Sequence, residues 1–477
     1  MADVEERMTQ LEQALDTCFL LVCSIFVFLM QFGFAALEVG SIRPKNTKAV
    51  LLKNISDAAI GALVWWLLGH GVAFGNGRDF IGEDQMAFSP QLNPDRIGEI
   101  ALEYSRWMLQ WAFAATSTTI VSGALAERVA LHAYLIYAVV ITALIYPVVA
   151  HWAWAENGWA SALRDEGDLL VGCGVADFSG SGVVHYTGGL MALVAAVCTH
   201  PRGGRFDSEG KPRRLERQSP ALNVLGALIL WAGWFFFNAS GVESFSAQPD
   251  DAAKSMLNTA VCPSAAVVVT MFVHWLHHRS FDPFMATNGL LGGLVAITAS
   301  SPMVETEGSF VIGFLSGVLV FYGSKLLLKF KVDDVVDASV VHGLCGLWGM
   351  VATGLFTTKV GYARAYDEDR ADKCCGVFYG CDGSLLAANV AFVLAQTAWV
   401  GGTALILFLG IKYTLGLRVN NTIEEEGMDK TRHGGYQGGV TPTAPGAVMD
   451  AVRRLRGSST TNAIRPPAQS STSDVLA

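Results

Sequence analysis

Long apolar runs, separated by short polar segments, fill most of this sequence. Of its 477 residues 52% are hydrophobic and 16% are charged, whereas a soluble domain usually carries about a quarter charged residues. Because about 20 mostly apolar residues cross a bilayer as a helix, the runs predict an all-α polytopic membrane protein with about eleven transmembrane helices. Their cores are expected near residues 19–35, 60–73, 107–124, 134–154, 183–197, 224–237, 260–276, 289–297, 311–322, 340–355 and 385–411.

The charges of the connecting segments predict the orientation of the chain. Lys and Arg gather around residues 43–53 and 202–217, while Asp and Glu gather around residues 79–99 and 165–168. These basic and acidic segments alternate between successive spans, and an excess of Lys and Arg marks the cytoplasmic side of a membrane. We therefore expect the N-terminus outside and the C-terminus in the cytosol.

This orientation divides the chain into three parts. Residues 1–17 are expected to be an extracellular N-terminal segment, residues 18–415 the transmembrane domain, and residues 416–477 a cytosolic tail whose Pro/Ser/Thr-rich distal part is disordered. The first apolar run is expected to be a retained span, because the acidic segment before it has no basic region of a secretory signal. The sequence has no basic face interleaved with aromatics, which argues against nucleic acid as a partner.

A short pattern occurs twice, five predicted spans apart. The first copy, VVHYTGGLMALV, contains His185 and Gly189, and the second, VVHGLCGLWGMV, contains His342 and Gly346. An odd number of spans per copy predicts an inverted five-helix repeat, a plan in which the functional site lies near the membrane midplane. Glycines let two helix backbones approach closely. The two histidines are therefore expected to meet across the pseudo-twofold axis.

Two simpler interpretations of the pair remain open. The match is short, and two unrelated core histidines could each bond to a backbone carbonyl. Against these, an aspartate precedes each copy, at Asp177 and Asp337, and ionisable groups inside a membrane usually mark a substrate or proton pathway. Two neutral imidazoles in contact share one N–H···N bond and can line a pore without carrying charge. Such a pore suits a small neutral molecule, or one that sheds its proton on entry.

Aromatic residues gather near the expected outer ends of three spans. Trp152 and Trp154 lie at the end of the fourth, Trp111 and Phe113 lie on the third, and three consecutive phenylalanines ending at Phe237 close the sixth. Such residues are ordinary belt residues in most membrane proteins. If they converge above the histidines, however, their π faces can hold a monovalent cation, and phenyl rings can close the pore to water.

The nine cysteines show no metal-ligand spacing. Cys374, Cys375 and Cys381 share one polar loop, where some pairing is expected if the loop faces an oxidising space. The acidic stretch at residues 333–337 is expected to cap helices and to meet tail residues rather than to bind ions. The other cysteines are expected to be small hydrophobes in or near spans: Cys18, Cys23, Cys173, Cys198, Cys262 and Cys345.

Longer motifs carry a family resemblance. They are QFGFAALEVGSIRPKN, FAATSTTIVSGALAER, AHWAW, DFSGSGVVH, GWFFFN, VDDVVDASVVHG and, in the tail, GMDKTRHGG. With them the sequence resembles the ammonium transporter/methylammonium permease/Rhesus superfamily, in its ammonium-transporter branch and close to plant and algal members. The resemblance implies transmembrane transport in which ammonium is recruited, deprotonated and passed as ammonia through a twin-histidine hydrophobic pore with a proton relay.

The resemblance also assigns roles to individual residues. His185 and His342 match the twin pore histidines, and Phe113 and Phe237 match the stacked phenyl gate. Trp154 matches the external tryptophan that recruits the cation, and its presence favours the ammonium-transporter branch over the Rhesus branch.

Two further matches carry a structural question. Asp177 matches an acidic residue of the recruitment vestibule, although we expect it mainly to cap a helix. The family follows its gate phenylalanine with Asn-x-Gly-Ser, and that serine helps to hold ammonium, whereas this chain has Ser240 followed by Gly241. Either Ser240 reaches the vestibule after a local backbone adjustment, or recruitment relies on Trp154 and Phe113 alone.

For the tail, Thr431 matches a regulatory threonine whose phosphorylation by a kinase shuts the pore. The resemblance further implies a homotrimer with one pore per subunit, located in the lipid bilayer of the plasma membrane. Its substrates would be ammonium, ammonia and methylammonium. No enzymatic activity, cofactor or metal is expected.

Two other function classes fit parts of the sequence. An ammonium sensor with little or no flux would use the pore fold for binding and the tail for signalling, supported by the long tail and the basic stretch at residues 453–456. An intramembrane metallohydrolase would use His185, His342 and an aspartate. Zinc, however, prefers three protein ligands plus water, and the aspartates lie eight and five residues from their histidines, too far along a helix.

Overall fold

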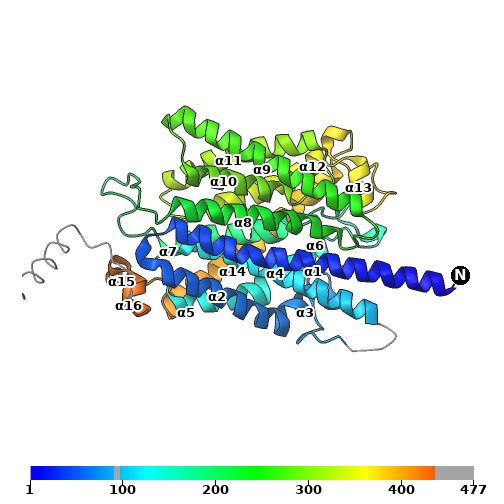
Figure 1. The fold of residues 1–477 in the computed structure, drawn as a ribbon, viewed down its shortest axis with the longest axis horizontal. Helices are drawn as coiled ribbons and strands as arrows, with labels where there is room; N and C mark the ends of the chain where they lie inside the picture. Colours follow the sequence, from blue (N-terminus) through cyan, green and yellow to red (C-terminus); the bar gives the residue numbers. More distant parts are fainter. Residues whose placement is uncertain (1, 91–96, 436–477) are drawn as a thin grey trace, which may run out of the picture. The chain divides into compact units, whose positions relative to one another are not determined.

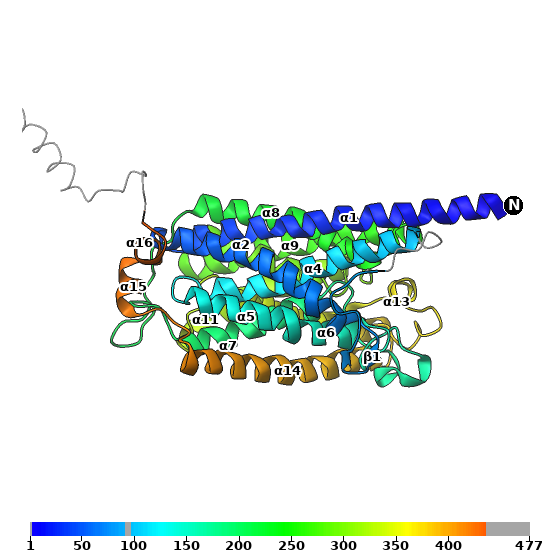
Figure 2. The same ribbon diagram turned by 90° about the horizontal axis from the view of Figure 1, so that it is seen from below.

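The helices lie side by side, as the two views in Figures 1 and 2 show. The structure is a computed structural model that describes residues 2–90 and 97–435. Residues up to His433 form one compact unit, to which the description below refers. In chain order the helices are α1 (Ala2–Ser41), α2 (Thr47–Val64), α3 (His70–Phe74), α4 (Ile97–Leu125), α5 (Leu131–Val140), α6 (Tyr146–Trp154), α7 (Thr187–Thr199), α8 (Pro220–Ala239), α9 (Pro249–His278), α10 (Pro283–Ile297), α11 (Thr306–Lys329), α12 (Cys345–Phe356), α13 (Lys359–Ala365), α14 (Ser384–Thr414), α15 (Asn421–Glu426) and α16 (Met428–Arg432).

Short π-helical turns join or precede several of these helices. Trp65–Gly69 connects α2 to α3, and Ile141–Ile145 connects α5 to α6. Ser181–Tyr186 leads into α7, and Ser339–Leu344 leads into α12. Such turns are rare and frequently mark functional sites. A two-residue antiparallel pair, β1 (Gly77–Arg78) with β2 (Ile81–Gly82), lies in the segment after α3.

The apolar runs form helices as expected, which confirms an all-α polytopic membrane fold. Within the described residues, nine helical segments are long and apolar enough to cross a membrane. The two remaining predicted spans correspond to α10, which has only 15 residues, and to α4, whose apolar run is interrupted by TSTT at residues 116–119. The number eleven and the orientation remain predictions.

Helix α1 is longer than the first predicted span. It begins at Ala2 and has 40 residues, about 60 Å of helix against a hydrocarbon core of about 30 Å. Residues 2–17 form the first part of this helix, and their end extends past the neighbouring helices in Figure 2. Their extracellular location remains a prediction.

Glycines let α1 and α8 pack with their backbones almost in contact. A Cβ atom at Gly40 would lie 2.4 Å from the backbone N of Asn223, and one at Gly226 would lie 2.4 Å from the backbone N of Leu37. Real side chains do not approach so closely, so larger residues would push the two helices apart. This packing places the C-terminal part of α1 against the first half of α8.

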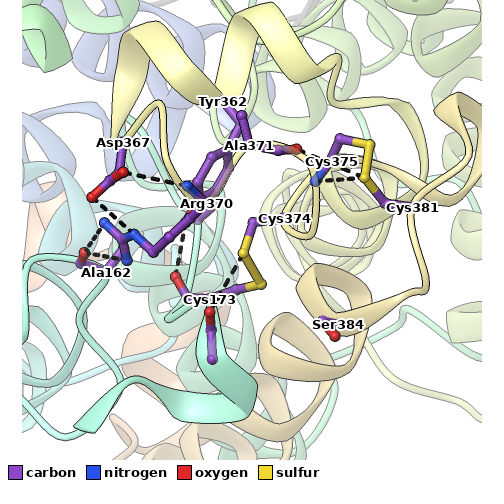
Figure 3. The surroundings of a disulfide bond; sticks show 12 residues. Ala162, Cys173, Tyr362, Asp367, Arg370, Ala371, Cys374, Cys375, Cys381 and Ser384 are labelled. Atoms are coloured by element: carbon purple, nitrogen blue, oxygen red, sulfur yellow. Dashed lines mark hydrogen bonds and ion pairs between the residues drawn. A yellow bond between two sulfur atoms is a disulfide. The ribbon is translucent and has the colours of Figure 1, made fainter. Parts of the chain in front are cut away.

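Two disulfides tie the loops at one end of the helices (Figure 3). Cys173 pairs with Cys374, and Cys375 pairs with Cys381. The expected pairing in the polar loop is confirmed, but the expectation that Cys173 is a free small hydrophobe is wrong. Cys173 lies in a loop before the π-helical turn of α7, and this loop passes beside the loop before α14. The other five cysteines of that group are free.

The first part of the predicted tail packs against loops at the opposite end of the unit. Asp429, in α16, accepts hydrogen bonds at 3.0 Å from the backbone N–H groups of Lys48 and Ala49, and thereby caps the start of α2. Asn46 accepts the backbone N–H of Met428 at 3.0 Å. The distal tail, including the stretch expected to be disordered, lies outside the described residues.

Of the aspartates before α12, one makes the expected contact and one does not. Asp334 accepts the backbone N–H of Ser339 at 2.7 Å, so the predicted capping role is confirmed there. Asp333 instead pairs with Arg202 at 2.8 Å and Arg205 at 3.2 Å, both in the loop after α7. Burial alone would raise the pKa of the Asp333 carboxyl, but Arg202 outweighs this and holds that pKa well below its usual range. The ion-pair partners of Asp333 thus come from the loop after α7 rather than from the tail.

Candidate functional site

Two histidines from distant parts of the chain meet at the centre of the helices. His185 and His342 have their Nδ1 atoms 3.3 Å apart and their ring centroids 5.3 Å apart. Both side chains are buried, with 0% and 4% of their surface exposed. The Nε2 atom of His185 has no hydrogen-bond partner among the described residues. The predicted meeting of the two histidines is confirmed, and its role in transport remains a prediction.

Close backbone contact produces this meeting. Each histidine lies in the π-helical turn at the start of its helix, α7 or α12. A Cβ atom at Gly189 would lie 2.0 Å from the backbone N of Gly343, and one at Gly346 would lie 2.9 Å from the backbone N of Tyr186. Both repeat glycines therefore serve the expected purpose, which is to let the two helix starts cross without a side chain between them.

A buried carboxylate holds the start of the first π-helical turn. Asp177 accepts the backbone N–H of Gly180 at 3.2 Å, of Gly182 at 3.0 Å and of Val183 at 2.8 Å. These donors have no partner within the helix, so the carboxylate satisfies them. The capping role expected of Asp177 is therefore observed, while a role in attracting cations remains a prediction.

A column of aromatic rings continues from the histidines toward α6. The ring of His185 lies 5.3 Å from Phe237, Phe237 lies 4.4 Å from Phe113, and Phe113 lies 5.9 Å from Trp154, measured between centroids. The indole N–H of Trp154 donates to the backbone O of Asp177 at 2.8 Å, which fixes the ring beside the start of the column. Trp154, Phe113 and Phe237 thus converge on the histidine pair.

Other aromatics near the same ends do not join this column. Trp111 packs on Phe28, with centroids 5.2 Å apart, and Trp152 donates its indole N–H to the backbone O of Phe80 at 3.0 Å. Their sequence positions resemble those of the column residues. The two groups differ only in how their helices are rotated, and this rotation could not be predicted from their positions in the sequence.

One residue of the site, Trp234, was not predicted from the sequence. Trp234 stacks on His185 at 4.9 Å and lies 6.5 Å from His342, with its indole N–H donated to Thr298 at 3.0 Å. It forms a flat wall along the histidine pair. A signal was available, because Trp234 precedes Phe237 by three residues and therefore shares its helix face.

The serine after the gate does not offer its hydroxyl to the column. Ser240 is buried and donates to the backbone O of Phe237 at 2.8 Å, within its own helix end. A Cβ atom at Gly241 would lie 2.6 Å from Oγ of Ser179 and 2.7 Å from the ring of Phe178. The position that carries serine in the family pattern is therefore filled here by a neighbouring ring. Of the two expectations, this geometry favours recruitment without Ser240.

The aspartates of the repeat are already engaged by the protein. Asp337 accepts hydrogen bonds from Asn288 at 2.9 Å and Ser324 at 3.0 Å, away from the histidines. No group of three or more His, Cys, Asp or Glu residues that could hold a metal ion occurs in residues 2–90 and 97–435. The described part of the chain thus offers no support for a metallohydrolase.

The threonine that is predicted to be regulatory lies in α16. Thr431 is partly buried and donates its hydroxyl to the backbone O of Gly427 at 2.8 Å. It follows Asp429, the residue that caps α2, by two positions. A phosphate on Thr431 would therefore add negative charge beside the contact that docks the tail.

An integral, multi-pass helical protein with a column of rings leading to a buried histidine pair belongs to the class of membrane transport proteins. A sequence profile described as Ammonium Transporter Family matches residues 18–437. Ammonium transporter 1 member 2 of Arabidopsis thaliana is 38% identical over 408 residues, covering 83% of this chain and 78% of the relative. Ammonium transporter 1 member 3 of Solanum lycopersicum is 36% identical over 434 residues, covering 89% and 93%. The chain belongs to the ammonium transporter family, and is a transporter rather than an enzyme.

Solved structures support the same fold. A structure titled Sensor Amt Protein superposes with a TM-score of 0.78 at 29% identity, covering 88% of this chain and 99% of that one. The crystal structure of Candida albicans Mep2 superposes with a TM-score of 0.75 at 23% identity, covering 85% and 86%.

Proposed function

We propose that this chain carries ammonium across the membrane by separating it into ammonia and a proton at the histidine pair. The observation that carries the proposal is the unbroken column from Trp154 through the two phenyl rings to His185, with centroid steps of 5.9, 4.4 and 5.3 Å. A hydrated cation does not fit between phenyl rings at 4.4 Å. The substrate must therefore lose its water, and then its proton, to go further.

Recruitment falls to Trp154 and Phe113. Their π faces attract a monovalent cation, an interaction worth about 0.5–2 kcal/mol. Asp177 adds negative charge behind this position, although its oxygens are occupied by backbone N–H groups. Ser240 contributes to the shape of the helix end rather than to binding.

The histidine pair provides the proton relay. A neutral pair shares one Nδ1–H···Nδ1 bond, so one ring is an acceptor at Nε2 and the other carries its proton there. Ammonium gives a proton to Nε2 of His185, the shared proton shifts to His342, and His342 releases its own Nε2 proton inward. Ammonia passes along the rings as a neutral molecule. One positive charge and one ammonia thus cross for each ammonium.

The remaining parts of the proposal concern the assembly and its control. We propose a homotrimer in the plasma membrane, with methylammonium as a second substrate and a kinase acting on Thr431. A sensor with little flux is the less favoured alternative, because the curated relatives are named ammonium transporters. A sensor would show saturable binding without uptake.

Uptake of labelled methylammonium into proteoliposomes, with and without a membrane potential, tests the proposal. The double variant His185→Ala with His342→Ala should lose selective, potential-dependent uptake, and normal uptake in it would refute the assigned pore. Trp154→Leu should raise the half-saturating concentration by about 2- to 30-fold, the equivalent of a lost cation–π contact. Trp111→Leu is the matched control, because Trp111 lies outside the column and should leave that concentration unchanged.

A further inference from the structure

A small cavity lies beside His342, and neither Phe113 nor Phe237 lines it. Its lining includes Phe34, Glu38, Thr119, Val336 and His342. The volume that the centre of a water molecule can occupy in this cavity is about 20 Å³. A volume of about 10–15 Å³ of this kind is enough for one water molecule. Glu38 and His342 therefore line one space that is large enough for one water molecule.

Glu38 is buried in this position. It lies near the end of α1 with 1% of its surface exposed, and its Oε2 atom accepts from Asn54 at 3.4 Å and from Ser122 at 3.3 Å. Both bonds are long for a carboxylate, whose charge-assisted bonds are usually about 2.7–2.9 Å. The side chain is thus held in place without being saturated by its protein partners.

The cluster behind Glu38 is rich in groups that exchange protons or hydrogen bonds. Lys53, on α2, is 2% exposed, and its Nζ atom has no hydrogen-bond partner among the described residues. Thr119, which also lines the cavity, donates to Asp57 at 2.5 Å. Burying such groups in a membrane protein is costly and typically serves a substrate or proton pathway.

We propose that Glu38 is the proton-relay residue that follows His342, receiving the proton through the cavity and returning it on the inner side. The inference rests on the proposed function, because it needs a proton that leaves the histidine pair. The rings of Trp234 and Phe237, which pack on the pair, cannot carry a proton inward. Among the residues lining this cavity, Glu38 is the carboxyl, and a carboxyl can accept a proton at one oxygen and donate it again.

The transfer balances in protons and charge. The Nε2 proton of His342 moves to the bridging water as that water gives one of its own to the Glu38 carboxylate. The carboxyl then loses this proton toward the inner loop that contributes Val336 to the cavity lining, and the carboxylate is restored. Ammonia is released on the inner side and takes up a proton there. The net result is one ammonium ion moved from the outside to the inside, with Glu38 unchanged.

A purely structural role for Glu38, as the counter-charge of Lys53, makes a different prediction. Loss of that pairing would lower stability and uptake together. Loss of a relay would instead lower the charge moved per substrate while neutral ammonia still passed. The ratio of charge to substrate therefore separates the two roles.

The experiment measures this ratio in proteoliposomes that contain the full chain. Ammonium-evoked current on a solid-supported membrane gives the charge, and labelled methylammonium uptake gives the substrate. Glu38→Gln should lower the ratio by about tenfold or more, the usual scale of a lost proton-transfer group, whereas Glu38→Asp should restore part of it. Asp251→Asn is the matched control, because Asp251 is also a buried carboxylate, at 5%, but it pairs with Arg364 and does not line the cavity. It should keep the wild-type ratio.

Four outcomes decide the matter. A lowered ratio in Glu38→Gln alone supports the relay. An unchanged ratio there, or an equal loss in Asp251→Asn, overturns it while leaving the proposed transport intact. Wild-type protein without current or uptake overturns the proposed function, and the relay with it. If Glu38→Gln fails to fold, Glu38→Asp decides, because its shorter side chain must lower the ratio by weakening the water bridge, and an unchanged ratio would refute the relay.

Discussion

The contact between the two helix starts makes one substitution unusually informative, namely Gly189→Ala. The added Cβ atom would lie 2.0 Å from the backbone N and 2.4 Å from the Cα atom of Gly343. Non-bonded atoms need about 3.5 Å, so the backbones must separate locally by about 1 Å or more. No rotamer change relieves this, because the crowded atoms belong to the main chain. The 3.3 Å between the histidine Nδ1 atoms would then exceed hydrogen-bonding distance.

Two measurements follow for this variant. Overpacking of this kind costs about 1–3 kcal/mol of unfolding free energy, and a misplacement of about 1 Å at a reacting group costs up to about 100-fold in rate. Methylammonium uptake should therefore fall much further than thermal stability. Gly402→Ala, on α14 with no neighbouring atom within 4 Å, is the matched control and should leave uptake unchanged. Wild-type uptake in Gly189→Ala would refute the argument that glycine sets the histidine contact.

Three further results are expected. Arg202→Met leaves the buried carboxylate of Asp333 without its main partner, which should cost about 3–5 kcal/mol in thermal unfolding. The lowered pKa of Asp333 contributes wild-type stability that is present above about pH 4 and is lost as the pH falls. Without Arg202 this pKa should rise, so acid unfolding should begin at higher pH, and an unshifted acid transition would contradict the assignment. Gly241→Ser, which puts a serine at the position that carries it in the family pattern, should destabilise the protein rather than improve half-saturation, because its Cβ would lie 2.7 Å from the ring of Phe178; a tighter half-saturation at unchanged stability would show that the ring moves aside. Asp429→Ala removes the cap of α2, worth about 0.5–2 kcal/mol, and should speed cleavage of the tail in limited proteolysis, whereas an unchanged rate would mean that other contacts dock it.

The sequence predicted features that local chemistry decides. Helices formed where apolar runs are long, because a bilayer demands satisfied backbone groups over a known thickness. The histidine pair could be predicted because a repeat carries pairing information: His185 and His342 lie 157 residues apart, yet each has glycine at the same offset. Trp154 and Phe113 followed from the resemblance rather than from periodicity.

What the sequence could not show depends on contacts between distant segments. The pairing of Cys173 with Cys374 spans 201 residues, and nothing near either cysteine encodes the neighbouring loop. The rotation that sets Trp154 in the column and leaves Trp152 outside it depends on how α6 packs. From the sequence, Glu38 is one polar residue near the end of a span. Only the packing of α4 against α1 and the position of the π-helical turn Ser339–Leu344 place it beside His342.

The repeat explains why the two histidines are in contact, but it does not explain the direction in which a proton moves between them. His185 and His342 are related by it, as are the two glycines that let them meet, so an ideal pair would pass a proton equally well either way. The surroundings break this equivalence. Stacked rings cover the pair on the side of His185, whereas a cavity with the carboxyl of Glu38 opens beside His342. If the relay runs as proposed, the asymmetry between rings and carboxyl separates the paths of ammonia and proton, because ammonia follows the apolar rings while the proton follows the groups that can hold it.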